Sequence, residues 1–178
     1  MLFAHCLSRF WGCESQVYNL DKKDVTWEWC TLRKYLNGEF LQKFTREEQD
    51  RIIKTTIHNP ENLWYSTPGG NDTPDKIFLL SLEEVDGYFG NSGDYQHQRR
   101  KKDDKCFSNA HDTARQIKYG DEVSWWWLRS PGSGLKYAAM AYCAGIVNVY
   151  GFHVDVCDGL LVAQAGGVRP ALWLNWQP

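Results

Sequence analysis

Glycine and valine form a regular framework late in the chain, in the stretch AYCAGIVNVYGFHVDVCDGLLVA from Ala141 to Ala163. Gly145 and Gly151 stand where tight turns need a permissive backbone, and Val147 and Val154 stand where strands must pack inward. We therefore expect this stretch to fold as short strands joined by turns.

The same stretch lacks five residue types that recur elsewhere in the chain. The sequence holds 11 Lys, 9 Glu, 8 Gln, 2 Met and 9 Trp, and none of these lies among the 23 residues, where composition alone predicts about five. Strands and turns disfavour Lys, Glu and Gln, which accounts for about half of the deficit. The residues between the glycines and valines share no chemical property, and this mixture favours an exposed surface over a core.

From Trp125 onward, turn signals separate short apolar segments. These segments are WWWLRS, YAAMAY, IVNVY, FHVDV, LLVA and VRPALWL. Their length and spacing predict a small, meandering antiparallel sheet.

The first half of the chain has helical patterns. Apolar residues recur at helical spacing at Trp29, Leu32, Leu36 and Phe40. We expect Thr26 to cap this helix and Gly38 to end it.

Two capping boxes mark further helix starts, from Thr45 to Glu48 and from Ser81 to Glu84. The segment DKIFLLS, of strand length, precedes the second box, and SNAHDTARQIKY predicts a weaker helix. Helices first and strands afterward indicate an α+β fold.

The segment 91–105, NSGDYQHQRRKKDDK, is polar and highly charged, and we expect a mobile loop there. Its basic run is followed at once by Asp103 and Asp104, and the net charge of the chain is -2. These charges favour a solvated loop over a nucleic-acid site.

No apolar run approaches the roughly eighteen residues of a membrane span. The opening MLFAHCLSRFWGC is broken by His5 and Arg9 before a secretory segment can form. The sequence therefore predicts no signal peptide and no membrane insertion.

The six cysteines are scattered without a CxxC pair, and the five histidines are equally dispersed. We expect free thiols, no metal and no cofactor. A length of 178 residues fits one domain spanning 1–178.

Four ordered blocks carry a resemblance to a known family. They comprise Trp27, Cys30, Leu32, Arg33, Leu36 and Asn37, then residues 75–81 (DKIFLLS), then 126–132 (WWLRSPG), and finally 167–174 (GVRPALWL). In these blocks the chain resembles a widespread bacterial and phage domain that has no assigned function.

The resemblance implies a C-type lectin-like fold, in the branch that includes formylglycine-generating enzymes, with a small twisted antiparallel sheet in the second half. Similar domains are the variable proteins of diversity-generating retroelements, in which adenines of a template are miscopied. Codons of AAC or AAT type randomised in this way cannot reach Lys, Glu, Gln, Met or Trp. The resemblance thus implies a variable region at about 137–165.

We expect a ligand-binding protein, not an enzyme, whose target is an unknown protein or surface ligand. The resemblance implies display on a phage particle or cell surface, and it implies that Arg129 and Arg169 anchor loops on the scaffold. The predicted ligand-binding residues are Tyr137, Tyr142, Cys143, Ala144, Ile146, Asn148, Val149, Tyr150, Phe152, His153, Asp155, Val156, Cys157 and Asp158.

Two alternatives remain open. Formylglycine-generating relatives use paired cysteines with copper, and Cys143 with Cys157 could take that role, although both lie within the region expected to vary. A calcium-dependent sugar-binding lectin could use Asp155 and Asp158. The ligand and the oligomeric state do not follow from the sequence.

Overall fold

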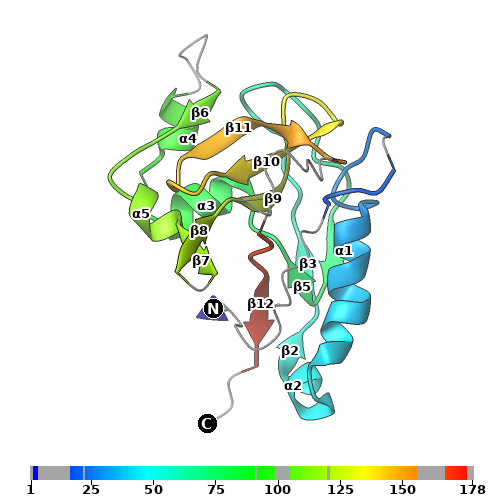
Figure 1. Cartoon of the computed structure of the whole chain (residues 1–178). Coiled ribbons are helices and arrows are strands. Elements are labelled where there is room, and N and C mark those ends of the chain that lie inside the picture. The colour runs from blue at the N-terminus through cyan, green and yellow to red at the C-terminus, as the bar shows by residue number, and fades with distance from the viewer. Residues whose placement is uncertain are drawn as a thin grey trace.

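The first long helical segment begins at Thr31. The computed structural model describes residues 2–3, 17–21, 23–90, 92–98, 105–119, 121–155 and 167–175. Helix α1 (Thr31–Tyr35) continues without a break into the π-helical turn η1 (Leu36–Phe40) and the 3-10 turn η2 (Leu41–Lys43). Figure 1 shows this segment along one side of the molecule, opposite the short helices α4 (Asp94–His97) and α5 (Asp112–Arg115).

The predicted ends of this helix are wrong. Cys30, not Thr26, is the N-cap, and Gly38 lies inside η1. The start is set by a distant segment, because the amide of Thr31 donates to the side-chain oxygen of Asn19 at 3.2 Å. Trp29 is 64% exposed and precedes the helix. The remaining apolar positions of the predicted face, Leu32, Leu36 and Phe40, are buried as expected.

Both predicted capping boxes are confirmed. Thr45 caps α2 (Arg46–Arg51) with Glu48, and Ser81 caps α3 (Leu82–Tyr88) with Glu84. In each box the hydroxyl accepts from the amide three residues on, and the glutamate accepts from the amide of the cap.

One sheet is built around β12 (Ala171–Leu174). This strand pairs antiparallel with β1 (Leu2–Phe3), β5 (Ile77–Phe78) and β2 (Ile52–Ile53). A separate ribbon joins β3 (Thr55–Ile57) to β4 (Thr73–Asp75). The late segment VRPALWL therefore packs with early strands, away from the meander in which it was predicted.

The second sheet has the order β6-β11-β10-β9. Its members are β6 (Cys106–Phe107), β11 (Val147–His153), β10 (Tyr137–Ala141) and β9 (Trp126–Pro131). The antiparallel meander predicted for β9, β10 and β11 is confirmed.

The prediction of two strands separated by a turn at Gly151 is wrong, because β11 runs through this residue. Gly151 has a φ of +85°, and its amide donates to the side-chain oxygen of Asn148 at 2.9 Å. The register of β10 against β11 shifts nearby, so Gly151 marks an irregularity within one strand.

Two other predictions need correction. The segment 108–119 contains only the short helix α5 (Asp112–Arg115), and Ile117–Tyr119 forms β7, which pairs with β8 (Glu122–Ser124). Within 91–105, helix α4 (Asp94–His97) buries Tyr95, so this part is not a loop. Residues 91 and 99–104 of that segment, and the predicted strand LLVA, lie outside the described residues.

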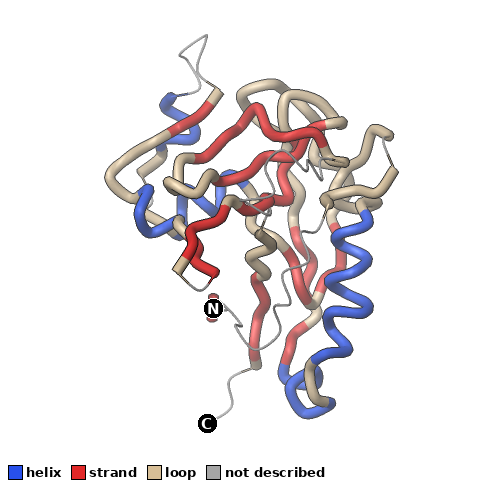
Figure 2. Tube along the Cα trace, viewed as in Figure 1, coloured by secondary structure: helices blue, strands red, loops and turns tan. Residues whose placement is uncertain are grey.

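The core joins both halves of the chain. Trp126, Trp127 and Leu128 of β9 are fully buried and share one hydrophobic cluster with Leu36 of η1 and Leu172 of β12. Figure 2 shows the helices at the flanks and the strands between them. The α+β class is confirmed. The separation into helices first and strands afterward is incomplete, because strands β2 to β5 lie among the helices of the first half of the chain.

Candidate recognition surface

The turn between β10 and β11 spans residues 142–146. The amide of Tyr142 donates to the carbonyl of Ile146 at 2.8 Å, and the amide of Gly145 donates to that of Tyr142 at 2.7 Å. Gly145 has a φ of +85°, and a Cβ there would lie 1.8 Å from the carbonyl oxygen of Asp112. The turn therefore packs its backbone directly against α5.

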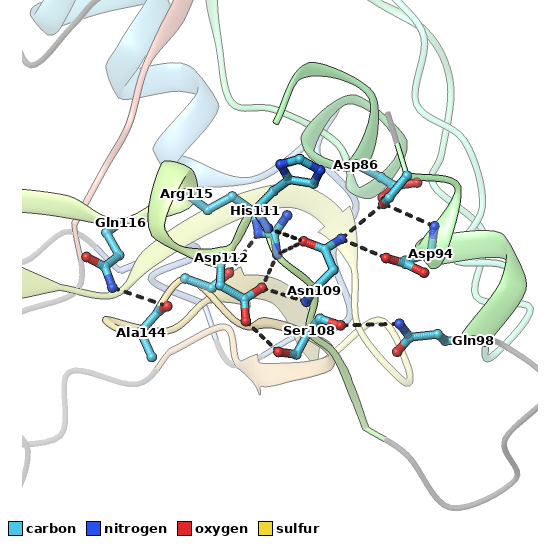
Figure 3. Close-up of polar contacts among 12 residues, drawn as sticks. Asp86, Asp94, Gln98, Ser108, Asn109, His111, Asp112, Arg115, Gln116 and Ala144 are labelled. Atoms are coloured by element: carbon cyan, nitrogen blue, oxygen red, sulfur yellow. Dashed lines mark hydrogen bonds and ion pairs between the residues drawn. The ribbon is translucent and has the colours of Figure 1, made fainter. Parts of the chain in front are cut away.

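Arg115 of α5 holds the backbone of this turn. Its side chain is fully buried, and Nε donates to the carbonyl of Gly145 at 2.8 Å. The same guanidinium forms an ion pair with Asp112 and stacks over the ring of Phe107 at 5.5 Å. The next residue, Gln116, donates its side-chain amide to the carbonyl of Ala144 at 3.4 Å (Figure 3).

Asn109 connects Arg115 to the helices behind the turn. Its side-chain oxygen accepts from Arg115 at 3.0 Å, and its Nδ2 donates to Asp94 at 2.8 Å and to Ser92 at 3.0 Å (Figure 3). The hydroxyl of Ser92 donates in turn to Asp86 at 2.5 Å. The hydrogen bond from Asn109 holds the pKa of Asp94 below its usual range. This polar network fixes α3, α4 and α5 relative to the turn.

Nine of the predicted ligand-binding residues are exposed or half-buried. They are Tyr137, Tyr142, Cys143, Ala144, Ile146, Tyr150, Phe152, His153 and Asp155. Val156, Cys157 and Asp158 lie outside the described residues.

The expectation that Asn148 and Val149 face the solvent is wrong. Val149 has no exposed surface, and Asn148 is 5% exposed. The side-chain Nδ2 of Asn148 donates to the hydroxyl of Tyr142 at 2.7 Å, and its side-chain oxygen accepts from the backbone amide of Gly151. Asn148 therefore serves the backbone of β11, and Val149 belongs to the core.

Phe152 belongs partly to the scaffold. Its ring centroid lies 5.4 Å from that of Trp125, which is 6% exposed, and 5.9 Å from that of Tyr142. Burial raises the pKa of Tyr142 in this cluster. The three rings link the core to the surface.

Four half-buried rings form a second cluster, which we name the tyrosine row: Tyr65, Tyr150, Tyr137 and His153. Successive ring centroids are 5.8, 5.4 and 5.4 Å apart. Tyr137 and His153 are direct partners in the register of β10 and β11, which places both side chains on one face of the sheet.

Charged side chains accompany the tyrosine row. The Nζ of Lys105 lies 4.5 Å from the ring centroid of Tyr150, and His153 pairs with the carboxylate of Asp155. The row thus combines aromatic area with hydrogen-bonding groups, the composition that recurs in binding surfaces.

Tyr65 is a surface residue that the sequence predictions missed. It lies in a turn at residues 63–66, more than eighty positions before its ring partner Tyr150. The sequence held one signal for it, a Trp-Tyr pair within the turn-rich segment NPENLWYSTPGG. Large aromatic side chains in a surface loop can indicate a binding site.

The predicted anchoring role of two arginines is confirmed. The buried Arg129 donates to the carbonyls of Leu79 and His58, each at 2.7 Å, and pairs with Glu84. Arg169 donates to the carbonyl of Arg115 at 3.3 Å. Arg129 thus joins β9 to the segments at His58 and Leu79, and Arg169 joins its own loop to α5.

Cys30, Cys106 and Cys143 are thiols that form no disulfide, as predicted for these three. Burial raises the pKa of Cys30 to about 12, so this thiol stays protonated. Within the described ranges, no group of three or more His, Cys, Asp and Glu side chains is placed to hold a metal ion. The pairing of Cys143 with Cys157 lies outside the described residues.

The fold and the surface define an α+β domain that presents a tyrosine-rich face on a tightly fixed β-turn scaffold. Residues 3–176 match the model of a family described as a domain of unknown function, DUF6273, and the chain belongs to this family. The predicted membership of a domain family without assigned function is thereby confirmed. No curated protein and no solved structure matches the chain. In the part of the chain that the structure describes, no helix is long and apolar enough to span a membrane.

Proposed function

We propose that this protein is the ligand-binding variable protein of a diversity-generating retroelement. It displays side chains of the β10–β11 turn and of β11 on a C-type lectin-like scaffold for recognition of a macromolecular target. The observation that carries the proposal is that the backbone of this segment is held largely by groups outside it.

The outside groups hold the backbone at both ends of the segment. Arg115 and Gln116 fix the turn through the carbonyls of Gly145 and Ala144. Farther along β11, the amide of Tyr150 donates to the carbonyl of Lys105 at 3.2 Å. These contacts use main-chain atoms of the segment, so they persist when its side chains change.

The segment separates positions that maintain the fold from positions that can vary. Gly145, Gly151 and Val149 are constrained by close contacts or by complete burial. Exposed or half-buried positions such as Ala144 and Tyr150 intervene. A surface that must tolerate many side chains needs this separation, because overpacking or cavities in the core would cost stability.

The composition of the segment supports the genetic part of the proposal. No Lys, Glu, Gln, Met or Trp occurs from Ala141 to Ala163, as expected when codons of AAC or AAT type are randomised at adenines. The scaffold matches the fold expected for such proteins in one coarse respect: helices and small antiparallel sheets support a surface late in the sequence.

The flanking DNA provides the decisive test. We expect a near-copy of the codons for residues 137–165 that differs almost only at adenines, beside a gene for a reverse transcriptase. Sequencing of independent isolates should then show substitutions concentrated at exposed or half-buried positions such as Ala144 and Tyr150, with Val149 and Gly151 retained. A locus without such a copy would remove the basis for diversification.

A further inference from the structure

We propose that Tyr65 is a constant contact residue of the recognition surface and that this surface fits an acidic segment of a protein partner. The inference rests on the proposed function, because it assigns a partner class to the same surface. It adds a residue that lies far outside the variable region of 137–165.

The ring geometry places Tyr65 at one end of the tyrosine row. Its centroid lies 5.8 Å from that of Tyr150, with an angle of 85° between the ring planes. Tyr150 then contacts Tyr137, which contacts His153. Tyr65, from a loop in another part of the chain, therefore extends the surface that β10 and β11 form.

The loop that carries Tyr65 is rigidly held. Asn62 is fully buried, and its Nδ2 donates to the carbonyls of Pro131 at 2.9 Å and Val149 at 2.8 Å. The backbone amide of Asn62 donates to the carbonyl of Thr67 at 2.8 Å, and this hydrogen bond closes the loop.

A neighbouring side chain fastens the same loop to α4, because the indole of Trp64 donates to the carbonyl of Tyr95 at 2.6 Å. Ser66 adopts a φ of +52°, an uncommon conformation for a residue other than glycine. A fixed loop presents the Tyr65 ring with little entropy left to lose on binding, which is the property of an anchor residue.

The form of the row favours a protein partner over a sugar. Neighbouring rings meet at 85°, 58° and 81°, so no two neighbouring rings offer coplanar faces on which sugar rings could stack in series. The ammonium of Lys105 covers one face of Tyr150. Such an irregular surface fits protruding side chains, as tyrosine-rich binding surfaces do.

The charges around the row favour acidic contacts. Lys105 is exposed, and its Nζ lies 4.5 Å from the ring centroid of Tyr150. The carboxylate of Asp155, next to the row, is paired with His153. A lysine beside phenolic hydroxyls matches a carboxylate on the partner, because complementary charges both steer association and add charge-assisted hydrogen bonds.

The test uses the full chain displayed as a library. Cys143, Ala144 and Ile146 of the turn are randomised, whereas Tyr65, Tyr150 and the pair of His153 with Asp155 are kept. Binders are selected in parallel against negatively and positively supercharged variants of one fluorescent protein, at about 150 mM salt. Each purified binder is then measured with the substitutions Tyr65→Ser and Tyr65→Phe, and with Tyr88→Ser as a control at an exposed tyrosine of α3.

We expect binders to the negatively charged target, and in these binders Tyr65→Ser should weaken Kd about tenfold while Tyr65→Phe and Tyr88→Ser change it about threefold or less. Thermal unfolding of each variant verifies that it is folded. If Tyr65→Ser changes Kd less than twofold in folded binders, Tyr65 is not a contact residue. Equal numbers of binders to the positive target would overturn the acidic partner.

Two further outcomes separate this inference from the proposed function. Failure of the folded library to yield any binder would overturn the proposed function, and the inference with it. Binding of the unaltered chain to an arrayed glycan, abolished by Tyr65→Ser, would replace the protein partner with a carbohydrate and leave the recognition role of the surface intact.

Discussion

Arg115 donates from Nε to the carbonyl oxygen of Gly145, thirty residues later in the chain, at 2.8 Å. Both residues are buried, and Gly145 could not carry a side chain without meeting Asp112. A buried cation thus fixes the tip of the candidate recognition surface through a main-chain atom. This arrangement makes the turn geometry independent of the neighbouring side chains of Cys143 and Ala144.

The first prediction concerns Arg115. Arg115→Ala should lower the free energy of unfolding by about 3–5 kcal/mol, because it leaves Asp112 and buried carbonyls without their donor. Arg115→Lys keeps the positive charge but loses the planar Nε donor, so we expect faster hydrogen exchange of the amides at 142–146 in the folded protein.

Gln116→Ala is the matched control for Arg115. Gln116 donates to the same turn at 3.4 Å from a more exposed position, so its loss should cost about 0.5 kcal/mol or less. Unchanged exchange of the turn amides in Arg115→Lys would show that the turn does not depend on this donor.

The second prediction compares two glycines. Gly145→Ala combines a left-handed backbone conformation with a clash against the main chain of Asp112, so it should cost about 3 kcal/mol or more. At Gly134 a Cβ would meet no atom within 4 Å, and Gly134→Ala should stay within about 0.5 kcal/mol. Urea unfolding measures both, and equal losses would contradict the packing of the turn against α5.

Local signals predicted the parts of the fold that local contacts determine. The capping boxes at Thr45 and Ser81 were predictable because each forms between residues three apart. The start of α1 was not, because Asn19 fixes the amide of Thr31 from another segment. Gly151 was ambiguous for a related reason: a glycine in a strand pattern can mark a turn or an irregularity within the strand, and only the partner strand decides.

The candidate surface was predictable in its position along the chain but not in its full membership. The composition of the late segment pointed to β11 and the preceding turn, yet Asn148 and Val149 of that segment turn inward. Tyr65 joins the surface through a loop held by Asn62, a contact that depends on three-dimensional packing. No periodicity in the sequence encodes such a contact.

The third prediction concerns pH. Asp94 has a pKa below its ordinary value of about 3.9. The main cause is the hydrogen bond that the side chain of Asn109 donates to its carboxylate. A carboxyl group with a lowered pKa in the folded state stabilises the protein above its unfolded pKa, and this contribution is lost as the pH falls through the folded pKa. The wild type should therefore lose more stability than Asp94→Asn between about pH 5 and pH 3.

Urea unfolding at the two pH values measures this difference, and Asn109→Ser provides the control. Asn109→Ser removes the amide donor of the hydrogen bond to Asp94, so the additional loss caused by acid should shrink in that background. Parallel pH dependences of the wild type and Asp94→Asn would contradict a role for this hydrogen bond in the folded state.

The last prediction separates scaffold from recognition residues on β11. Phe152→Ser should lower the free energy of unfolding by about 2 kcal/mol, because the ring packs against the buried Trp125. Tyr150→Ser should cost about 1 kcal/mol or less, because its ring partners Tyr65 and Tyr137 are themselves half-exposed. Ala144→Ser, in the exposed turn, should stay within about 0.5 kcal/mol.

Chemical unfolding of the three variants ranks the positions by their dependence on the core. If Phe152→Ser leaves the free energy of unfolding unchanged, Phe152 belongs to the freely variable residues. The surface would then include the full exposed side of β11. Loss of folding in Tyr150→Ser would contradict the recognition role of the tyrosine row, because a residue required for folding could not vary among binders. The expected order, with Phe152 most costly and Ala144 least, confines diversification to positions whose partners are also at the surface.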